Sequence, residues 1–148
     1  MHAESGIGRH APYALATLRI VTGLIFLEHG TQKFLGFPPG QAAWSGLALN
    51  NPGAFAGIVE LVAGVLITIG LFTRAAAFIA SGTMAVAYWM VHAPQDFFPV
   101  NNAGDAAILY CFVFLYLVFA GPGAWSVDER RNSAHPAAPE RTASGGSL

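Results

Sequence analysis

Four long apolar segments divide the chain, and each is close to the length that an α-helix needs to cross a lipid bilayer. They cover residues 12–29, 54–72, 75–93 and 105–121. A membrane-spanning helix takes about 20 apolar residues, and it satisfies its backbone hydrogen bonds within its own segment. Turn-forming residues precede the second segment and follow the fourth. The pattern therefore predicts an all-α protein, an integral membrane four-helix bundle.

The composition agrees with a bilayer environment. Of the 148 residues, 54% are hydrophobic and only 10% are charged, whereas soluble domains carry about 25% charged residues. The net charge of −1 offers nothing to attract a nucleic acid. We therefore expect the lipid bilayer as the main partner and no nucleic acid.

Basic residues at the segment ends predict the orientation. One side of the predicted bundle holds only Lys33, and the other side holds Arg9, Arg74, Arg130, Arg131 and Arg141. Basic residues accumulate on the cytoplasmic side of membrane proteins. We therefore expect a multi-pass protein of the bacterial inner (cytoplasmic) membrane with both termini in the cytoplasm.

This orientation divides the chain into three parts. Residues 1–11 form a cytoplasmic N-terminal segment, and residues 12–128 form the membrane domain. Residues 129–148 are rich in Ser, Ala, Pro and Gly without an apolar period. We expect this last part to be a disordered cytoplasmic tail.

Ionisable residues interrupt the apolar segments at similar depths. A rise of about 1.5 Å per helical residue places Glu28, Glu60, His92 and Asp105 in the outer third of the membrane. Arg19 is the lone charge in the inner half of these segments. Charged residues inside membrane helices usually face the bundle and pair with one another. Arg19 and Glu60 are therefore expected to form an ion pair, either purely structural or part of a site.

Helical spacing separates neighbouring residues of the stretch FLEHGTQKF. Arg19, Phe26, His29 and Lys33 follow one another at intervals of three, four and seven residues and share one stripe. Glu28 points to the opposite side. We expect His29 inside the bundle and Glu28 against headgroups or another subunit.

Other readings of these residues stay open. Lys33 also suits an interfacial anchor, and His29 and His92 also suit simple hydrogen bonds to the outer loop. The histidines and acids lack the HxxxH, ExxH or CxxC spacing of a metal site, so none is assigned. The single cysteine, Cys111, excludes an intrachain disulfide or a CxxC redox pair.

Several short motifs, in this order, resemble those of the DoxX family of four-helix bacterial membrane proteins. The resemblance extends over about residues 12–128. Its motifs are Arg19, Gly23, Phe26, His29-Gly30 and Lys33-Phe34, then Glu60-Leu61, Gly64, Gly70-Leu71 and Thr73-Arg74-Ala75-Ala76, and finally Gly121-Pro122-Gly123 with Ser126 and Asp128. Asp105 departs from the pattern, since the family usually has a Glu near this position.

The resemblance implies a role in redox chemistry, because some members are linked to sulfur-compound oxidation with delivery of electrons to quinone and others to redox-stress complexes. We expect a small inner-membrane subunit of a redox system that aids quinone-linked oxidation or redox-stress defence. Whether the chain is itself an oxidoreductase is left open. The expected catalytic residues are His29, Glu60 and His92, and the expected quinone-binding residues are Arg19, Lys33 and Tyr88.

Two other function classes remain as alternatives. The first is a non-catalytic membrane assembly or interaction protein in which the polar residues join the helices. The second is a small-solute carrier, for which no inverted repeat or broken helix is visible. The redox hypothesis also calls for a partner subunit that supplies electrons, and a homo-oligomer is a further option.

Overall fold

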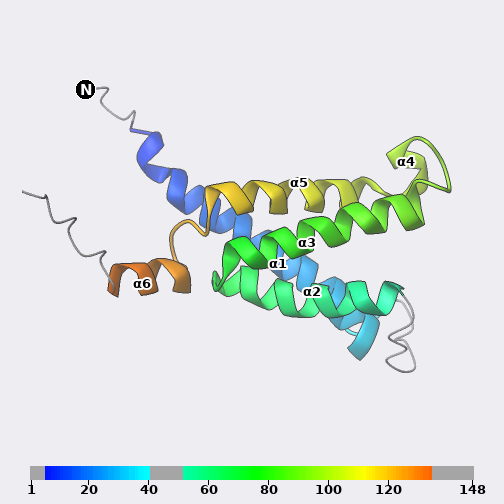
Figure 1. The fold of residues 1–148 in the computed structure, drawn as a ribbon, viewed down its shortest axis with the longest axis horizontal. Coiled ribbons are helices and arrows are strands. Elements are labelled where there is room, and N and C mark those ends of the chain that lie inside the picture. The colour runs from blue at the N-terminus through cyan, green and yellow to red at the C-terminus, as the bar shows by residue number, and fades with distance from the viewer. Residues whose placement is uncertain (1–5, 41–51, 135–148) are drawn as a thin grey trace, which may run out of the picture.

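The computed structural model describes residues 6–40 and 52–134, and every regular element in these residues is a helix. The prediction of an all-α protein is therefore confirmed (Figure 1). The elements in chain order are the short 3₁₀ turn Gly8–His10, α1 (Ala11–Leu35), α2 (Pro52–Ile69), α3 (Thr73–Ala87), the π-helix Tyr88–His92, α4 (Pro99–Asn102), α5 (Asp105–Ala120) and α6 (Val127–Ala134).

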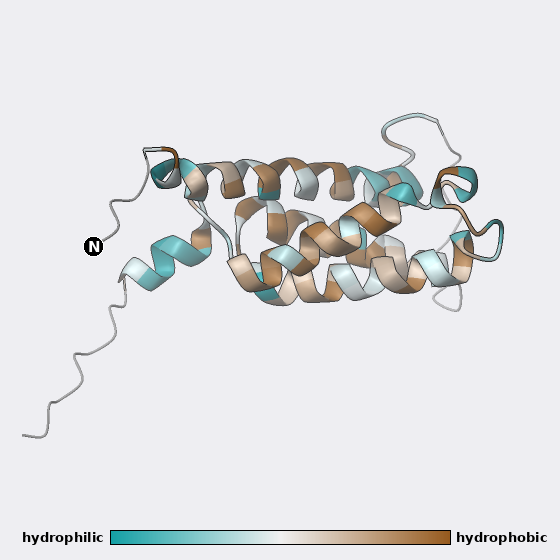
Figure 2. Ribbon diagram, turned by 90° about the horizontal axis from the view of Figure 1, so that it is seen from above, coloured by the Kyte–Doolittle hydropathy of each residue, from teal (hydrophilic) through white to brown (hydrophobic). Residues whose placement is uncertain are grey.

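Four of these helices form the predicted membrane bundle. The continuous helices Gly8–Leu35, Pro52–Ile69 and Thr73–His92 are long and apolar enough to cross a membrane, and Asp105–Ala120 is a shorter apolar helix. Hydrophobic residues extend along all four, whereas α6 is hydrophilic (Figure 2). The integral membrane four-helix bundle is thus confirmed.

Two element boundaries differ from the sequence prediction. Helix α1 continues past His29 to Leu35 and ends at Gly36, whose φ of 65° is left-handed. Residues 129–134 belong to α6, although no regular structure was expected from residue 129 onward. The rest of the expected tail, residues 135–148, and most of the outer loop, residues 41–51, lie outside the described residues.

The bundle consists of two helix pairs, α1 with α2 and α3 with α5. In the first pair the backbones approach closely because glycines face the neighbouring helix. A Cβ atom on Gly23 would lie 2.6 Å from Thr68 Oγ1, and one on Gly64 would lie 2.9 Å from Leu27 Cα. Small residues at helix interfaces allow this packing in membranes.

The two pairs meet in a small apolar core. Phe26, Ile67, Phe114 and Leu117 are all completely buried there. The rings of Phe26 and Phe114 make an edge-to-face contact with 4.8 Å between centroids. From the turn at residues 70–72, which joins α2 to α3, the two helices diverge towards the other end of the bundle (Figure 1).

Candidate functional site

One end of the bundle, formed by residues 67–74 and 118–128 around Arg19, is here called the closed end. Arg19 is completely buried. It donates hydrogen bonds of 2.6–3.2 Å to the carbonyl oxygens of Ile67, Thr68, Pro122, Ala124 and Trp125. The first two carbonyls belong to the last turn of α2, where unpaired carbonyls carry partial negative charge.

The buried guanidinium is therefore balanced by carbonyl groups. The expectation that Arg19 pairs with Glu60 is wrong, because Glu60 is held by Lys33. Five N–H donors on a planar group can satisfy several carbonyls at once, and among the described residues the guanidinium makes no direct ion pair.

Two glycines let backbone segments approach closely at the closed end. Gly70 has a φ of 71°, and a Cβ on it would contact Ser126 and lie 2.9 Å from Arg19 Nη1. Gly123 has a φ of 67°, and its Cβ would lie 2.8 Å from the carbonyl oxygen of Pro12. Other residues would be strained at both positions.

Two further side chains cap helices at the closed end. The Asp128 carboxylate accepts hydrogen bonds of 2.9 Å from the backbone N–H groups of Phe72 and Thr73, at the start of α3. Arg74 donates to the carbonyls of Val118 and Phe119 in the last turn of α5. Partial burial raises the pKa of Asp128, but these N–H donors outweigh it and hold the pKa below its ordinary value.

The closed end thus explains much of the motif pattern. Arg19, Gly70 and Asp128 all belong to motifs quoted for the family resemblance, and here all three join helix ends. These residues stabilise the fold, and none of them lines the cavity described next.

The opposite end, formed by residues 29–36, 52–60 and 86–110, is here called the open end. A cavity of about 1120 Å³ lies there between the two helix pairs. Its wall is largely apolar, with Phe26, Phe55, Phe78, Met84 and Met90 among its residues. The polar and titratable residues in this wall are His29, Gln32, Lys33, Glu60, Thr83, His92 and Tyr110.

An ion pair lies on the α1–α2 side of the cavity. Lys33 Nζ lies 2.6 Å and 2.7 Å from the two carboxylate oxygens of Glu60. The side chain of Glu60 is 6% exposed and that of Lys33 is 27% exposed. Gly57, one turn before Glu60, leaves room for the Lys33 stem, since a Cβ there would lie 3.3 Å from Lys33 Cδ.

His92 lies on the opposite side of the cavity, at the end of the π-helix. Its Nδ1 is 2.9 Å from the carbonyl oxygen of Asn102. A carbonyl only accepts, so Nδ1 carries the hydrogen and Nε2 remains to accept or release a proton. The side chain of Asn102 in turn donates to the Asp96 carbonyl and accepts from Gly104 N–H. The Asn102 carbonyl thus fixes the tautomer of this imidazole, which stands at the end of a π-helix, a feature frequent at functional sites.

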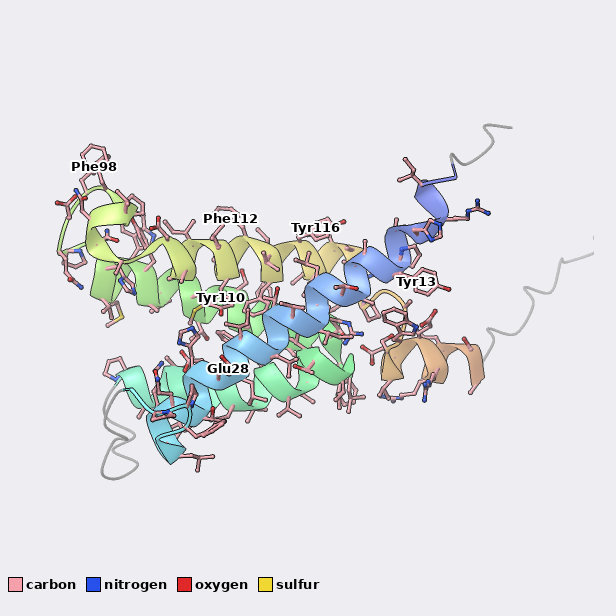
Figure 3. The ribbon with its side chains drawn as sticks, turned by 180° about the vertical axis from the view of Figure 1, so that it is seen from behind. Tyr13, Glu28, Phe98, Tyr110, Phe112 and Tyr116 are labelled. Carbon is pink, nitrogen blue, oxygen red and sulfur yellow. The ribbon has the colours of Figure 1, made fainter. Side chains whose placement is uncertain are left out.

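His29 contacts the second helix pair through Tyr110. The two rings meet edge-on, with 5.8 Å between centroids and an interplanar angle of 89°. Tyr110 lies between α5 and α1, whereas Phe112 and Tyr116 project from the other side of α5 (Figure 3). Glu28 and His29 are both exposed, but only His29 lines the cavity. The helical phase predicted from the sequence therefore places these neighbours in different surroundings correctly, although His29 is not buried inside the bundle.

The cavity brings together four of the six expected site residues, namely His29, Lys33, Glu60 and His92. Arg19 is at the closed end. Tyr88 lies outside the cavity lining and stacks on His92, with 6.5 Å between ring centroids and an interplanar angle of 20°. It therefore contributes to the position of His92.

Sequence reasoning missed Tyr110 as a cavity residue. Helix α5 is apolar on every side, so the hydrophobic pattern gave no signal of which face turns inward. In the described parts of the chain, no three His, Cys, Asp or Glu side chains come together as a metal site would require.

Comparison with known proteins adds family information. The family model described as DoxX matches residues 14–93. An uncharacterized protein of Haemophilus influenzae is 43% identical over 129 residues, which cover 85% of this chain and 96% of the relative. The inner membrane protein YphA of Escherichia coli is 30% identical over 142 residues, which cover 83% of this chain and 94% of the relative.

An uncharacterized membrane protein of Mycobacterium tuberculosis is 29% identical over 145 residues, which cover 88% of this chain and 85% of the relative. No solved structure matches the chain.

Proposed function

We propose a function for this chain, which belongs to the DoxX family of membrane proteins. Its open-end cavity binds the headgroup of a quinone, and the protein serves as a small membrane subunit of a redox system. One observation carries the proposal. Two histidines and a lysine–glutamate pair share a cavity of about 1120 Å³ whose wall is otherwise largely apolar.

The residues suit a quinone head in shape and polarity. Such a head is an apolar ring with an oxygen at each of two opposite edges. The cavity offers an imidazole from each helix pair, His29 on α1 and His92 after α3, and aromatic and aliphatic side chains between them. Ligand sites of this kind combine an apolar wall with a few placed polar groups.

Reduction of a bound quinone takes two electrons, which a redox centre in a partner subunit would supply, and two protons. His29 and His92 would each give a proton to one oxygen and then be reprotonated, because imidazole exchanges protons readily near neutral pH. The Lys33 ammonium would place a positive charge beside the quinone oxygens as negative charge develops on them. While the quinone is neutral, the Glu60 carboxylate balances the charge of that ammonium.

The proposed location is the bacterial inner membrane, with both termini in the cytoplasm. The four described arginines at helix ends, Arg9, Arg74, Arg130 and Arg131, belong to segments that meet or lie beyond the closed end (Figure 1). Lys33 is at the open end. The positive-inside bias then puts the cavity in the outer half of the membrane.

Quinone retention tests the proposal. The protein would be expressed, extracted in mild detergent and analysed for bound quinone per chain, as wild type and as His92→Phe. Loss of one hydrogen-bonding group in the cavity should lower retention about tenfold. His10→Phe, which changes an exposed histidine beyond the closed end, is the matched control and should retain quinone like wild type.

A melting curve for each variant shows whether the bundle is intact. Equal quinone content in His92→Phe and wild type, with the bundle intact, would contradict the proposal. A stoichiometric partner protein without any bound quinone would favour the assembly-protein alternative.

A further inference from the structure

One glycine in the bundle has no packing role among the described residues. Gly82 lies inside α3, is exposed, and a Cβ atom on it would meet no atom within 4 Å. Glycines of α1 and α2, such as Gly23, Gly30 and Gly64, each face the neighbouring helix at less than 3 Å. Glycine is among the least favourable residues in a helix interior, so packing within the protein gives no reason for it here.

Gly82 lines the cavity in a row with apolar side chains. Phe78 and Val86 lie one helical turn before and after it and are 66% and 56% exposed. Across from them, Phe55 of α2 also lines the cavity and is 60% exposed. The cavity reaches the outer surface between α2 and α3, because residues of both helices that line it are exposed there. Figure 1 shows that the two helices diverge towards the open end.

This mouth faces the bilayer. The exposed side chains of membrane-spanning helices contact lipid, and Phe55, Phe78 and Val86 at the mouth are aromatic or aliphatic. The hydroxyl of the neighbouring Thr83 is already bonded to the Ile79 carbonyl. The polar groups of the cavity, Lys33, Glu60 and His92, come from α1, the inner face of α2 and the π-helix. A molecule that fills the cavity and its mouth therefore meets polar groups at one end and apolar groups at the other.

We propose that the cavity is filled from the bilayer through the mouth between α2 and α3, by an amphipathic ligand whose apolar chain passes over Gly82 into the lipid. This inference rests on the proposed function, because the polar head occupies the same cavity. The missing side chain of Gly82 leaves the space in which the chain lies. A polar extension of the ligand would be unfavourable there, because it would lose its hydrogen bonds with water.

Two probes with the same substituted benzoquinone ring test the inference, one without a chain and one with a long isoprenoid chain. Binding of each to the full-length protein in detergent would be measured for wild type and Gly82→Leu. A Cβ atom at this position meets no atom within 4 Å, so the added side chain starts in open space. Affinity for the chain-bearing probe should fall about tenfold or more, the effect of losing contact with roughly two methylene groups.

Affinity of Gly82→Leu for the chain-free probe should equal that of wild type. Ala75→Leu places the same leucine side chain at an exposed α3 position that does not line the cavity, and it should bind both probes like wild type. Unchanged binding of the chain-bearing probe to Gly82→Leu would overturn the inference and leave the proposed function standing. An equal loss of affinity for both probes would also overturn the inference.

Two further results are distinguishable from these. If wild type binds neither probe, the proposed function itself fails and this inference fails with it. If Gly82→Leu changes the oligomeric state by light scattering while both probes still bind, the inference is overturned, and Gly82 is instead a contact between copies of the chain.

Discussion

Lys33 and Glu60 join the last turn of α1 to the middle of α2 through two contacts of 2.6 and 2.7 Å. The ion pair is at the open end, whereas Arg19 joins α1 to the end of α2 at the closed end. The first helix pair is thus held by a charged side chain from α1 near each of its ends. Between them, the glycines of α1 and α2 keep the two backbones close.

Lys33 and Glu60 should be energetically coupled. Lys33→Met leaves a nearly buried carboxylate without its partner, and breaking a buried pair costs about 3–5 kcal/mol. The lower end of that range is expected, because the side chain of Lys33 is 27% exposed. Glu60→Gln should cost less, since the amide oxygen still accepts from Lys33. Thermal unfolding in detergent measures both.

The double variant decides whether the pair interacts. Lys33→Met with Glu60→Gln should be more stable than the sum of the two single effects predicts. Strict additivity would show that the two side chains do not stabilise each other in solution.

Arg19→Lys should destabilise the protein nearly as much as Arg19→Met. Lysine has a single nitrogen with three donors, so it cannot reach five carbonyls on two separate segments. Each carbonyl left unsatisfied in the interior costs about 1–3 kcal/mol. Melting temperature and protease resistance measure the loss. Arg9→Lys, at an exposed position, should change neither, and full stability of Arg19→Lys would contradict the carbonyl-binding role.

Asp128 should make the stability of the closed end depend on pH. Its pKa is lowered in the folded protein, so its contribution is complete above the unfolded value of about 3.9. The contribution is lost as the pH falls through the lower, folded value. At pH 7, Asp128→Ala should cost about 1 kcal/mol, as for a lost helix cap.

The difference in melting temperature between wild type and Asp128→Ala should therefore shrink below about pH 4. The exposed neighbour Glu129 gives the control Glu129→Gln, which should melt like wild type at pH 7. A difference between wild type and Asp128→Ala that stays constant down to pH 2 would show that the carboxylate charge is not what caps α3.

The spans were predictable because a helix that crosses a bilayer must be long and apolar, and the hydropathy of the sequence shows such segments directly. The face of α1 was predictable as well, since Arg19, Phe26, His29 and Lys33 all turn toward the bundle interior or the cavity. Helical spacing fixes which side chains share a face, whatever lies opposite them.

The partners of those residues could not be predicted. Arg19 was expected to pair with Glu60 because opposite charges usually pair in membranes. Its partners are backbone carbonyls, which every residue has and which no sequence pattern can therefore identify. Lys33 was placed on the same stripe as His29, but as a quinone-binding residue or an interfacial anchor and not as the partner of Glu60. The continuation of α1 to Leu35 brings its ammonium to Glu60.

Topology reporters test the proposed orientation. A reporter fused after Ala134, and another inserted in the turn at residues 70–72, should both be cytoplasmic, because they lie at the arginine-rich end. A reporter inserted at Phe97, between the π-helix and α4, should be outside. A cytoplasmic signal from the Phe97 insertion would reverse the orientation and place the cavity in the inner half of the membrane.

His29 and its neighbour Glu28 provide the sharpest test of the cavity. His29 lines the cavity and meets the ring of Tyr110, whereas Glu28 is exposed outside it. His29→Phe keeps an aromatic ring against Tyr110, so the bundle should still fold, but it removes both ring nitrogens. Quinone retention should fall about tenfold, as for the loss of one hydrogen bond in an apolar site.

Glu28→Gln changes a charge one residue away and should leave quinone retention at the wild-type level, because its side chain does not reach the cavity. The contrast separates a binding role from a general effect of polar residues at the membrane surface. If both substitutions reduce retention equally, or if His29→Phe lowers only the amount of folded protein, His29 acts in the structure of the open end. The cavity would then bind its ligand through other groups, or the protein would function through a partner.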